Sequence, residues 1–356
     1  MAETNKTKTE EQSGQAQELF VAPSPHLSDP ATTRRLMLDV IIALMPAFVA
    51  ALIFFRENAI RLTVICLISC LVTEYLFNKI RKKPNSLGDL SAIVTALILA
   101  FTLPPDLPGF AAVIGSVVAI SIGKMIFGGL GHNIFNPAMV GRAFLMAAFP
   151  VLMTTWIAPA KTPIKLAGVE IVGIDKSNNN EKSKNVAAVS QATPLAMLKP
   201  GAKDRKMPDA FALFIGRTGG SLGETSVIAI LIGALYLLAR GTIDISIPFG
   251  MLGSAVLFGG IAYISAPDKF ANPMFHLGAG GLLFGAFFIA TDLVTTPLSK
   301  KGRWIFGAGC GILTMIIRQF GTYPEGVMFS VLMMNGLAPL ISRWTKPTPL
   351  GGHARG

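Results

Sequence analysis

Long apolar segments separated by short polar ones dominate the chain from residue 35 onward. Most of these segments are long enough to cross the hydrocarbon core of a bilayer as helices. The pattern therefore predicts about ten spanning helices, five on each side of a long polar stretch. They cover residues 36–55, 62–80, 86–103, 109–127, 138–157, 222–239, 245–264, 275–292, 303–318 and 326–342.

Three polar regions divide the chain into parts. Residues 1–34 are rich in Glu, Gln, Thr and Lys without an apolar run, which indicates a solvated tail and not a signal peptide. Residues 158–208 form a long polar loop, and residues 346–356 form a second tail. The two membrane halves are then residues 35–157 and 209–345.

Composition agrees with this division. Apolar residues make up 51% of the chain and charged residues only 14%, whereas soluble domains carry about 25% charged residues. These values exclude a soluble enzyme and favour an all-α polytopic membrane protein. The three cysteines, Cys66, Cys70 and Cys310, lie in apolar segments, so we expect packing residues, with a buried metal or cluster ligand as the alternative.

Basic residues predict the orientation. The net charge is +11, and Lys and Arg gather in alternate loops, which places those loops in the cytoplasm. Both termini are then cytoplasmic, and residues 158–208 lie outside. The loop residues that set this orientation are Arg34, Arg35, Lys79, Arg81, Lys82, Lys83, Lys124, Arg240, Lys300, Lys301, Arg303, Arg343 and Lys346, with Arg56 and Arg61 as exceptions.

A weak internal repeat runs through the two halves. Ser86–Ser91 (SLGDLS) matches Ser221–Ser226 (SLGETS), and each is followed about 50 residues later by an Asn-Pro pair, at Asn136 and Asn272. Each copy holds three predicted helices. Because three is odd, the second copy enters the membrane in the opposite sense, and such inverted repeats often enclose a binding site.

The turn between the fourth and fifth predicted helices carries candidate binding groups. Its sequence, Phe127–Pro137, is rich in glycine and contains Asn133 and Asn136, whose amides can donate and accept hydrogen bonds. Irregular backbone at membrane depth must be buried in protein or line a cavity. The alternative is an ordinary tight cytoplasmic turn.

Ionisable residues inside predicted spans are the second set of candidates, because a charge at the bilayer centre costs at least about 2.5–3.5 kcal/mol. Arg142 and Asp292 are the stronger candidates. For Asp39, Glu74 and Arg318 we favour helix-end positions from which the side chain reaches the interface. Glu224 completes the set. No Walker loop, Rossmann fingerprint, zinc spacing or soluble catalytic triad is present in the sequence, so we assign no catalytic or metal-ligating residue.

Several motifs in fixed order resemble one family. They are Ser24–His26, Gly128–Met139, Gly141–Phe144, Ser190–Thr193, Gly220–Ser226, Phe288–Asp292 and Tyr323–Gly326. From about residue 24 to 345 the chain resembles the D subunits of Rnf electron-transport complexes (RnfD), a family similar to the B subunit of the sodium-pumping NADH:quinone reductase.

The resemblance implies a fold of about ten helices with inverted repeats, similar to urea transporters, and two flavins. FMN is expected on Thr193, joined through its phosphate, within a motif that includes Ser190 and Ala192. Riboflavin is expected as a non-covalent flavin near Asn133 and Asn136. We also place Arg142, Glu224 and Asp292 in the cofactor-binding set.

Three residues depart from the family pattern. Gln191 stands where glycine is usual, Ala187 where the attachment motif has an aspartate, and Leu293 where proline follows Thr291-Asp292. The first two affect the expected efficiency of covalent attachment and leave Thr193 as its acceptor.

The resemblance implies electron transfer between ferredoxin and NAD through flavins, coupled to Na⁺ or H⁺ translocation in a prokaryotic cell membrane. It implies the A, B, C, E and G subunits of the Rnf complex as partners, especially the flavin-bearing G subunit, and no nucleic acid. The alternatives are a cofactor-free permease of the urea-transporter type and a purely structural assembly subunit.

Overall fold

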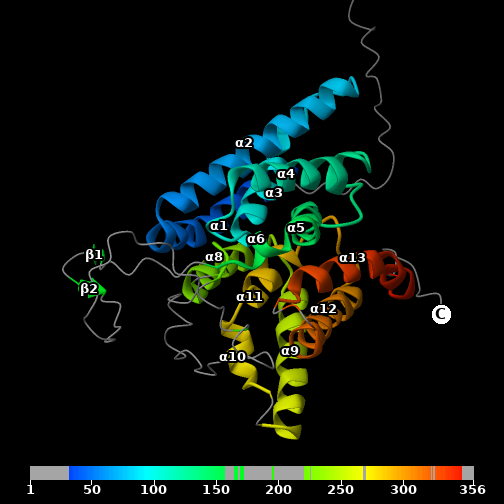
Figure 1. Cartoon of the computed structure of the whole chain (residues 1–356). Coiled ribbons are helices and arrows are strands. Elements are labelled where there is room, and N and C mark those ends of the chain that lie inside the picture. The colour runs from blue at the N-terminus through cyan, green and yellow to red at the C-terminus, as the bar shows by residue number, and fades with distance from the viewer. Residues whose placement is uncertain are drawn as a thin grey trace, which may run out of the picture. The chain divides into compact units, whose positions relative to one another are not determined.

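Helices form in every apolar segment that the sequence predicts to span, and we describe them from a computed structural model (Figure 1). The description covers residues 32–156, 164–166, 169–171, 195, 220–224, 226–267, 270–321, 323 and 325–346. Residues 33–356 group as one unit, to which the following statements refer.

The described residues of the first half form five helical segments. They are α1 (Thr33–Phe55), α2 (Glu57–Ile80), α3 (Ser91–Thr102) after a short 3-10 turn η1 (Leu87–Asp89), α4 (Gly109–Ile120) continued by the π-helical turn η2 (Ser121–Met125), and α5 (Pro137–Ala148) followed by α6 (Pro150–Thr154). Within this half, α2 packs on α3 and α4, and α4 packs on α5.

The second half repeats this number of segments. They are α8 (Val227–Ala239), α9 (Ser246–Ser265), the broken segment α10 (Pro273–Gly278), α11 (Leu282–Phe284) and π turn η4 (Gly285–Ile289), then α12 (Lys300–Phe320) and α13 (Val327–Trp344). The α9 helix packs along α12, which also contacts α13. Between the halves, α1 contacts α8 and α5 contacts α13.

Polar side chains start several of these helices. Asn136 accepts a hydrogen bond from the Met139 N–H, and Pro137 follows it at the first helical position, where its missing N–H leaves no helix bond unmade. Asn272 and Pro273 begin α10 in the same manner. Both Asn-Pro pairs of the predicted repeat are therefore helix starts.

Several predicted spans are shorter or more broken than expected, and in three of them single residues explain the difference. The third starts at Ser91 because Leu90 adopts a left-handed conformation, with φ of 64°. The fifth breaks at Phe149, since Pro150 disfavours helix in the residue before it. The eighth is interrupted near Gly280, whose φ of +69° ends the helical run.

The polar loop between the halves holds an antiparallel pair of short strands, β1 (Ile164–Leu166) and β2 (Val169–Ile171), which the sequence did not predict. Apart from this pair, the elements in the described part of the chain are helices, as predicted.

Among the described residues, four helices, α1, α2, α9 and α13, are long and apolar enough to cross a membrane; α3, α4 with η2, α5 and α8 are shorter apolar helices. Their outward faces are apolar as well. Along α1 and α2 exposed apolar side chains recur at every third or fourth position, at Leu38, Ile42, Met45, Val49 and Ile53 and at Ile60, Val64, Ile68 and Val72. Water does not favour such continuous apolar stripes, whereas lipid does.

Candidate functional site

A pocket lies where the two halves meet, and it gathers three of the residues that the sequence singled out. Asn133, Asn136 and Asp292 line it together with side chains of α1, α3, η2, α8 and η4. About 730 Å³ of space not filled by protein atoms, the mouth included, lies among mostly apolar side chains with a few polar ones. A mostly apolar lining with a few polar groups is typical of small-molecule and cofactor sites.

The glycine-rich turn brings the two asparagines to the pocket by different means. Gly128, Gly129 and Gly131 all have positive φ, a conformation that glycine adopts without strain. Asn133 donates to the Phe135 carbonyl at 3.2 Å, while its own side-chain oxygen is buried without a donor. That oxygen can therefore accept a hydrogen bond from a bound molecule.

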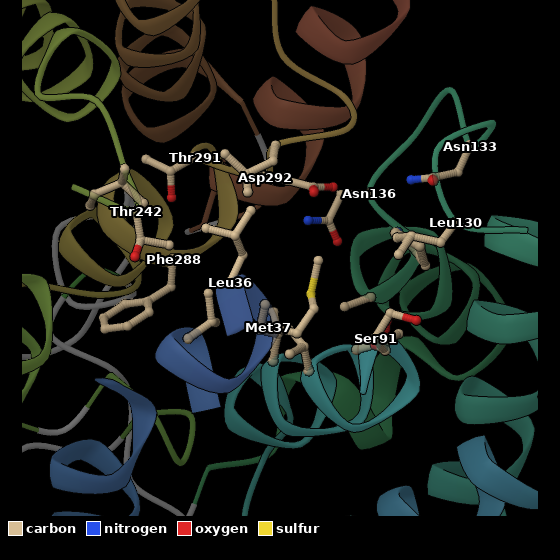
Figure 2. Close-up of a pocket in the computed structure, with 18 of the residues that line it drawn as sticks. Leu36, Met37, Ser91, Leu130, Asn133, Asn136, Thr242, Phe288, Thr291 and Asp292 are labelled. Atoms are coloured by element: carbon tan, nitrogen blue, oxygen red, sulfur yellow. The ribbon is translucent and has the colours of Figure 1, made fainter. Parts of the chain in front are cut away.

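Asn136 also has a structural role. Its oxygen caps α5, as described above, and its Nδ2 lies 3.5 Å from the Ile289 carbonyl of η4. Figure 2 shows Asn136 beside Asp292, with Asn133 farther along the pocket. Asn136 thus ties the glycine-rich turn to the second half of the chain.

Asp292 follows η4 and closes another side of the pocket. Its carboxylate accepts hydrogen bonds from the Val294 N–H at 3.3 Å and the Thr295 hydroxyl at 3.2 Å. Thr291 and Thr242 add hydroxyl groups to the pocket wall. Arg142, the other stronger candidate among the ionisable residues, does not line this pocket.

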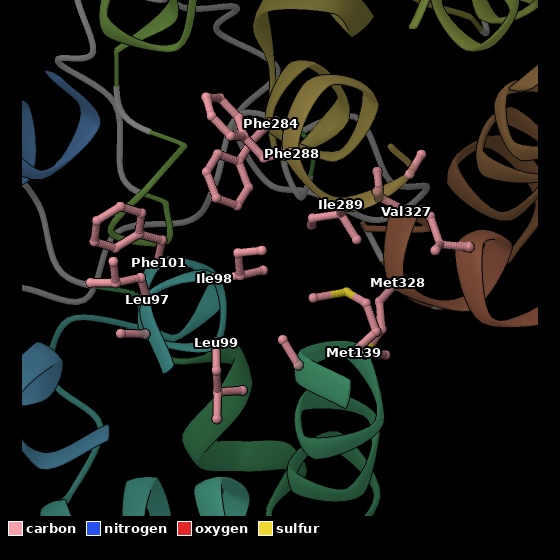
Figure 3. Close-up of a cluster of buried hydrophobic side chains, with 14 of the residues drawn as sticks. Leu97, Ile98, Leu99, Phe101, Met139, Phe284, Phe288, Ile289, Val327 and Met328 are labelled. Atoms are coloured by element: carbon pink, nitrogen blue, oxygen red, sulfur yellow. The ribbon is translucent and has the colours of Figure 1, made fainter. Parts of the chain in front are cut away.

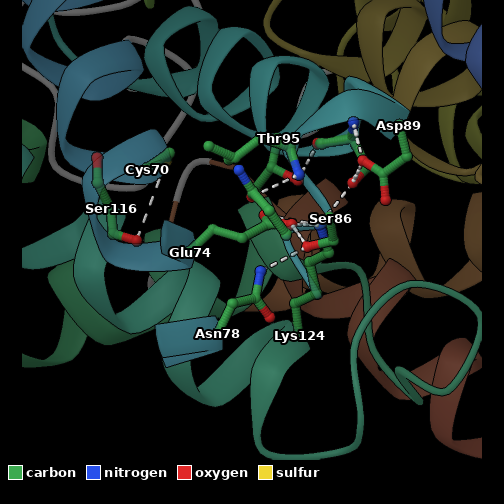
Figure 4. A network of polar contacts seen from close by, with 11 residues as sticks. Cys70, Glu74, Asn78, Ser86, Asp89, Thr95, Ser116 and Lys124 are labelled. Atoms are coloured by element: carbon green, nitrogen blue, oxygen red, sulfur yellow. Dashed lines mark hydrogen bonds and ion pairs between the residues drawn. The ribbon is translucent and has the colours of Figure 1, made fainter. Parts of the chain in front are cut away.

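A buried ion pair that the sequence did not predict borders the same pocket. Lys124 Nζ lies 2.8 and 3.0 Å from the two carboxylate oxygens of Glu74 and 2.5 Å from the Ser91 hydroxyl (Figure 4). Both charged side chains are at most 1% exposed. Ser86 also donates to Glu74 at 2.5 Å, so the carboxylate accepts hydrogen bonds from two side chains. Lys124 and Ser91 both line the pocket.

A second polar site surrounds Arg142. One end of its guanidinium pairs with Glu325, and Nη1 lies 3.8 Å from Glu224 Oε1. Arg318 of α12 lies nearby, with Nη1 donating to the His276 carbonyl at 2.8 Å. Arg142 and Glu224, both predicted, thus come together here, away from the asparagines, with Glu325 and Arg318 as additional members. We call these four residues the charge cluster.

An apolar layer accompanies α5 between the two sites. Asn136 begins that helix at the pocket, and Arg142 lies six residues farther along, about 9 Å by the helical rise. Figure 3 shows Met139 of α5 converging with Ile289 of η4 and Met328 of α13. Phe101, Phe284 and Phe288 extend the layer, with ring centroids of neighbouring pairs 6.2 and 5.2 Å apart.

We predicted that the side chains of Asp39, Glu74 and Arg318 reach the membrane interface from helix ends. This prediction is wrong, because all three side chains are buried. Asp39 accepts from Tyr236, Arg240 and Thr242 of the α8 region. These partners are about 200 residues away in sequence, so no local pattern could reveal them.

Several other predicted residues have simpler outcomes. Ser190, Ala192 and Thr193 lie outside the described residues; Leu195, two positions on, is buried beside Ala271, Phe275 and Ala279. Cys66, Cys70 and Cys310 are free and buried, and the described residues contain no group of three or more His, Cys, Asp or Glu side chains that could hold a metal ion. Their role is consistent with packing.

Comparison with known proteins identifies the family to which the chain belongs. A sequence model of the NQR2, RnfD, RnfE family matches residues 20–351. The chain belongs to this family. With its apolar helices and lipid-compatible outer faces, this family member is a multi-pass membrane protein.

Two curated relatives illustrate the similarity. The D subunit of the proton-translocating ferredoxin:NAD(+) oxidoreductase complex of Clostridium ljungdahlii is 40% identical over 343 residues, covering 93% of this chain and 96% of the relative. The D subunit of the Na(+)-translocating complex of Acetobacterium woodii is 42% identical over 330 residues, covering 92% and 94%.

A third relative is the D subunit of the ion-translocating oxidoreductase complex of Stutzerimonas stutzeri. It is 42% identical over 331 residues, covering 90% of this chain and 93% of the relative.

Proposed function

We propose that this chain is the D subunit of a Rnf-type complex, which carries electrons through flavins between ferredoxin and NAD and couples them to Na⁺ or H⁺ translocation. The observation that carries the proposal is similarity along nearly the whole chain to subunits of complexes with that named activity. One of those relatives belongs to a proton-translocating complex and one to a sodium-translocating complex, at 40% and 42% identity. Overall similarity therefore does not select the cation.

The ten helical segments would each cross a prokaryotic cell membrane, with both termini in the cytoplasm. The starting positions of three helix pairs support a repeat longer than the three-helix one expected from the motifs. The pairs α2 and α9, α4 and α12, and α5 and α13 begin 189, 191 and 190 residues apart, at Glu57 and Ser246, Gly109 and Lys300, and Pro137 and Val327. A five-segment unit also has an odd number of crossings, so the second copy is inverted, as in urea transporters.

In this topology the pocket lies towards the cytoplasm and would hold riboflavin. Its residues fit a flavin because the apolar walls suit a flat ring system, and Asn133 offers an unpartnered buried oxygen to a ring N–H. Asn136, Thr242 and Thr291 would add polar contacts at the ring edge or side chain. When bound, the flavin supplies the electron-carrying chemistry, and the protein positions it.

The second flavin, FMN, would be held by its phosphate on Thr193 in the outer loop. Sequence supports this attachment through Ser190, Ala192 and Thr193, while Ala187 and Gln191 are departures that would slow it. Leu195 fits such a site because its buried side chain fixes the chain two residues beyond the acceptor.

The apolar layer supports the coupling of electrons to ions. It gives no polar partner to a small cation, so an ion crossing it without a path would face a large desolvation cost. Moving one charge across the membrane involves about 2.3 kcal/mol per 100 mV. A cation that follows the electron compensates its charge, and the ionisable residues at both sites are positioned to respond to that change. The A, B, C, E and G subunits, the last carrying a flavin, would complete the path.

Three variants of the full chain, made with its own flavin transferase, test the flavin assignments separately. Thr193→Ala should abolish flavin fluorescence of the denatured band, because phosphodiester attachment needs its hydroxyl, while Ser190→Ala should retain at least part of it. Asn133→Ala should lower extractable riboflavin and leave the covalent flavin in place, since a lost hydrogen bond weakens binding by about 0.5–1.5 kcal/mol.

Asn136 needs a gentler change because it caps α5. Asn136→Ser keeps a capping oxygen and removes only the amide, so it separates binding from folding. Covalent flavin persisting in Thr193→Ala would overturn the attachment site. Riboflavin unchanged in both asparagine variants would leave the turn without a binding role.

A further inference from the structure

Glu224 differs from the other buried acids in what surrounds its oxygens. Its side chain is 3% exposed, yet neither carboxylate oxygen receives a hydrogen bond. The nearest cation, Arg142 Nη1, lies at 3.8 Å, beyond hydrogen-bonding distance. By contrast, Asp39 accepts hydrogen bonds from three side chains, and Glu74 accepts them from Lys124 and Ser86.

The neighbour that Glu224 does have is another acid. Both acids flank one guanidinium, since Arg142 Nη1 lies 3.8 Å from Glu224 Oε1 and Nη2 pairs with Glu325. Two carboxylates this close repel each other, and neither can donate while both are ionised. One proton removes the repulsion and provides the missing donor.

Burial raises the free-energy cost of having both carboxyl groups ionised. A buried carboxylate without donors loses the hydration that stabilises its charge, and such groups neutralise by binding a proton. Arg142 offsets one negative charge through its contact with Glu325. Arg318 and His276 face the same space from α12 and α10, but Arg318 keeps Nε and Nη2 unpartnered and gives no hydrogen bond to Glu224.

The tight fit around Glu224 shows that its position is built and not incidental. A Cβ at Gly281 would overlap Glu224 Oε1, so the glycine leaves room for the carboxylate where it stands. Gly280, the preceding residue, similarly accommodates Arg318 Nη2 at 3.1 Å and Glu325 Oε1 at 3.6 Å from the place of its missing Cβ. Two successive glycines thus shape the space that holds the acids.

We propose that Glu224 and Glu325 form a proton-binding pair that holds one proton at neutral pH. The proton comes from water and forms an O–H bond on Glu224, which then donates to the Glu325 carboxylate held by Arg142. Release returns the proton to water and leaves both acids ionised. The ligand of this site is the proton itself, and its position in the fold is separate from the pocket that Asn133 and Asn136 line.

Infrared difference spectroscopy of the purified full-length chain in lipid nanodiscs tests the pair, using neutral minus alkaline spectra in H₂O and D₂O. The wild type should show a carboxylic acid C=O band at neutral pH that shifts in D₂O. Glu224→Gln should remove that band component, because glutamine has the shape of the protonated acid but no proton to release. Glu325→Gln should remove it too, since Glu224 then ionises beside Arg142.

Asp39→Asn is the matched control, because Asp39 is similarly buried but fully supplied with donors. It should leave the band intact. The proposal would be overturned if the wild-type protein lacked the band at neutral pH. It would also be overturned if either glutamine variant kept the band at full intensity. Either variant suffices if the other fails to fold, as judged by size-exclusion chromatography.

Discussion

At the scale of single residues, Lys124 shows how a charge is kept inside this membrane protein. Its ammonium uses all three donors on Glu74 and Ser91, and it is 1% exposed. Such a pair is held together by its own attraction and by the absence of water to replace either partner. Removing one partner therefore leaves an uncompensated charge in an apolar interior.

Lys124→Met should destabilise the protein by about 3–5 kcal/mol, the range for breaking a buried pair. Adding Glu74→Gln to it should recover part of that loss because the orphaned charge is gone. Arg240→Met is the control: Arg240 is 41% exposed, and its buried partner Asp39 keeps two other donors, so the loss should be about 1 kcal/mol or less. Thermal unfolding in detergent measures all three, and equal losses for the two single variants would contradict this account.

Residue types in the sequence predicted which polar side chains are candidates for a binding site, but not which of them contact one another. Asn133, Asn136 and Asp292 were candidates, and they do share a pocket. Lys124 is 50 residues from Glu74 and 33 from Ser91, so its role depended on how α2, α3 and η2 pack. Arg142 and Glu224 were grouped with the asparagines, yet packing places them on the far side of the apolar layer.

At the scale of elements, glycines determine how closely α9 and α12 approach. A Cβ on Gly307 would meet the Ile247 carbonyl at 2.5 Å, and one on Gly311 would overlap the Met251 carbonyl and the Ser254 hydroxyl. Small residues at helix crossings allow this kind of backbone contact in membranes. Apolar segment length predicted these helices well, whereas their breaks depended on single residues such as Pro150 and Gly280.

Gly311→Ala should therefore destabilise the α9–α12 contact by about 1–3 kcal/mol, the range for overpacking. Gly253→Ala, on α9 itself, is the matched control because nothing lies within 4 Å of its missing Cβ. That variant should be neutral or more stable by up to about 1 kcal/mol, since alanine favours helix. Melting temperatures of the two purified variants make the comparison; a smaller loss for Gly311→Ala than for Gly253→Ala would rule out tight packing as the reason for the glycine.

At the scale of the whole molecule, the proposed topology places the two polar sites on opposite sides of the membrane. Pocket residues come from segment ends that the basic loops assign to the cytoplasm, including Met37, Lys124 and Thr242. Charge-cluster residues come from the opposite ends, near the outer loops. Loop charges in the sequence predicted the orientation, but the separation of the two sites became visible only in the packing.

Accessibility in intact cells tests that topology. Asn180→Cys should react with an impermeant thiol reagent from outside, and Lys82→Cys should react only after the membrane is opened. Background labelling should be low because Cys66, Cys70 and Cys310 are all buried. The opposite labelling pattern would invert the assignment of both sites.

The π-helical turns have a consequence for how such chains can diverge. Each contains one residue more than an α-helical turn, as the bond from the Ile126 N–H back to the Ser121 carbonyl and that from Ala290 to Gly285 show. Each also supplies a pocket wall, through Lys124 in one and Phe287 and Phe288 in the other. Deleting one residue there would rotate everything beyond it by about 100°, one residue's share of an α-helical turn. A substitution at the pocket changes the contacts of one side chain, whereas an insertion or deletion in either turn would displace a whole pocket wall.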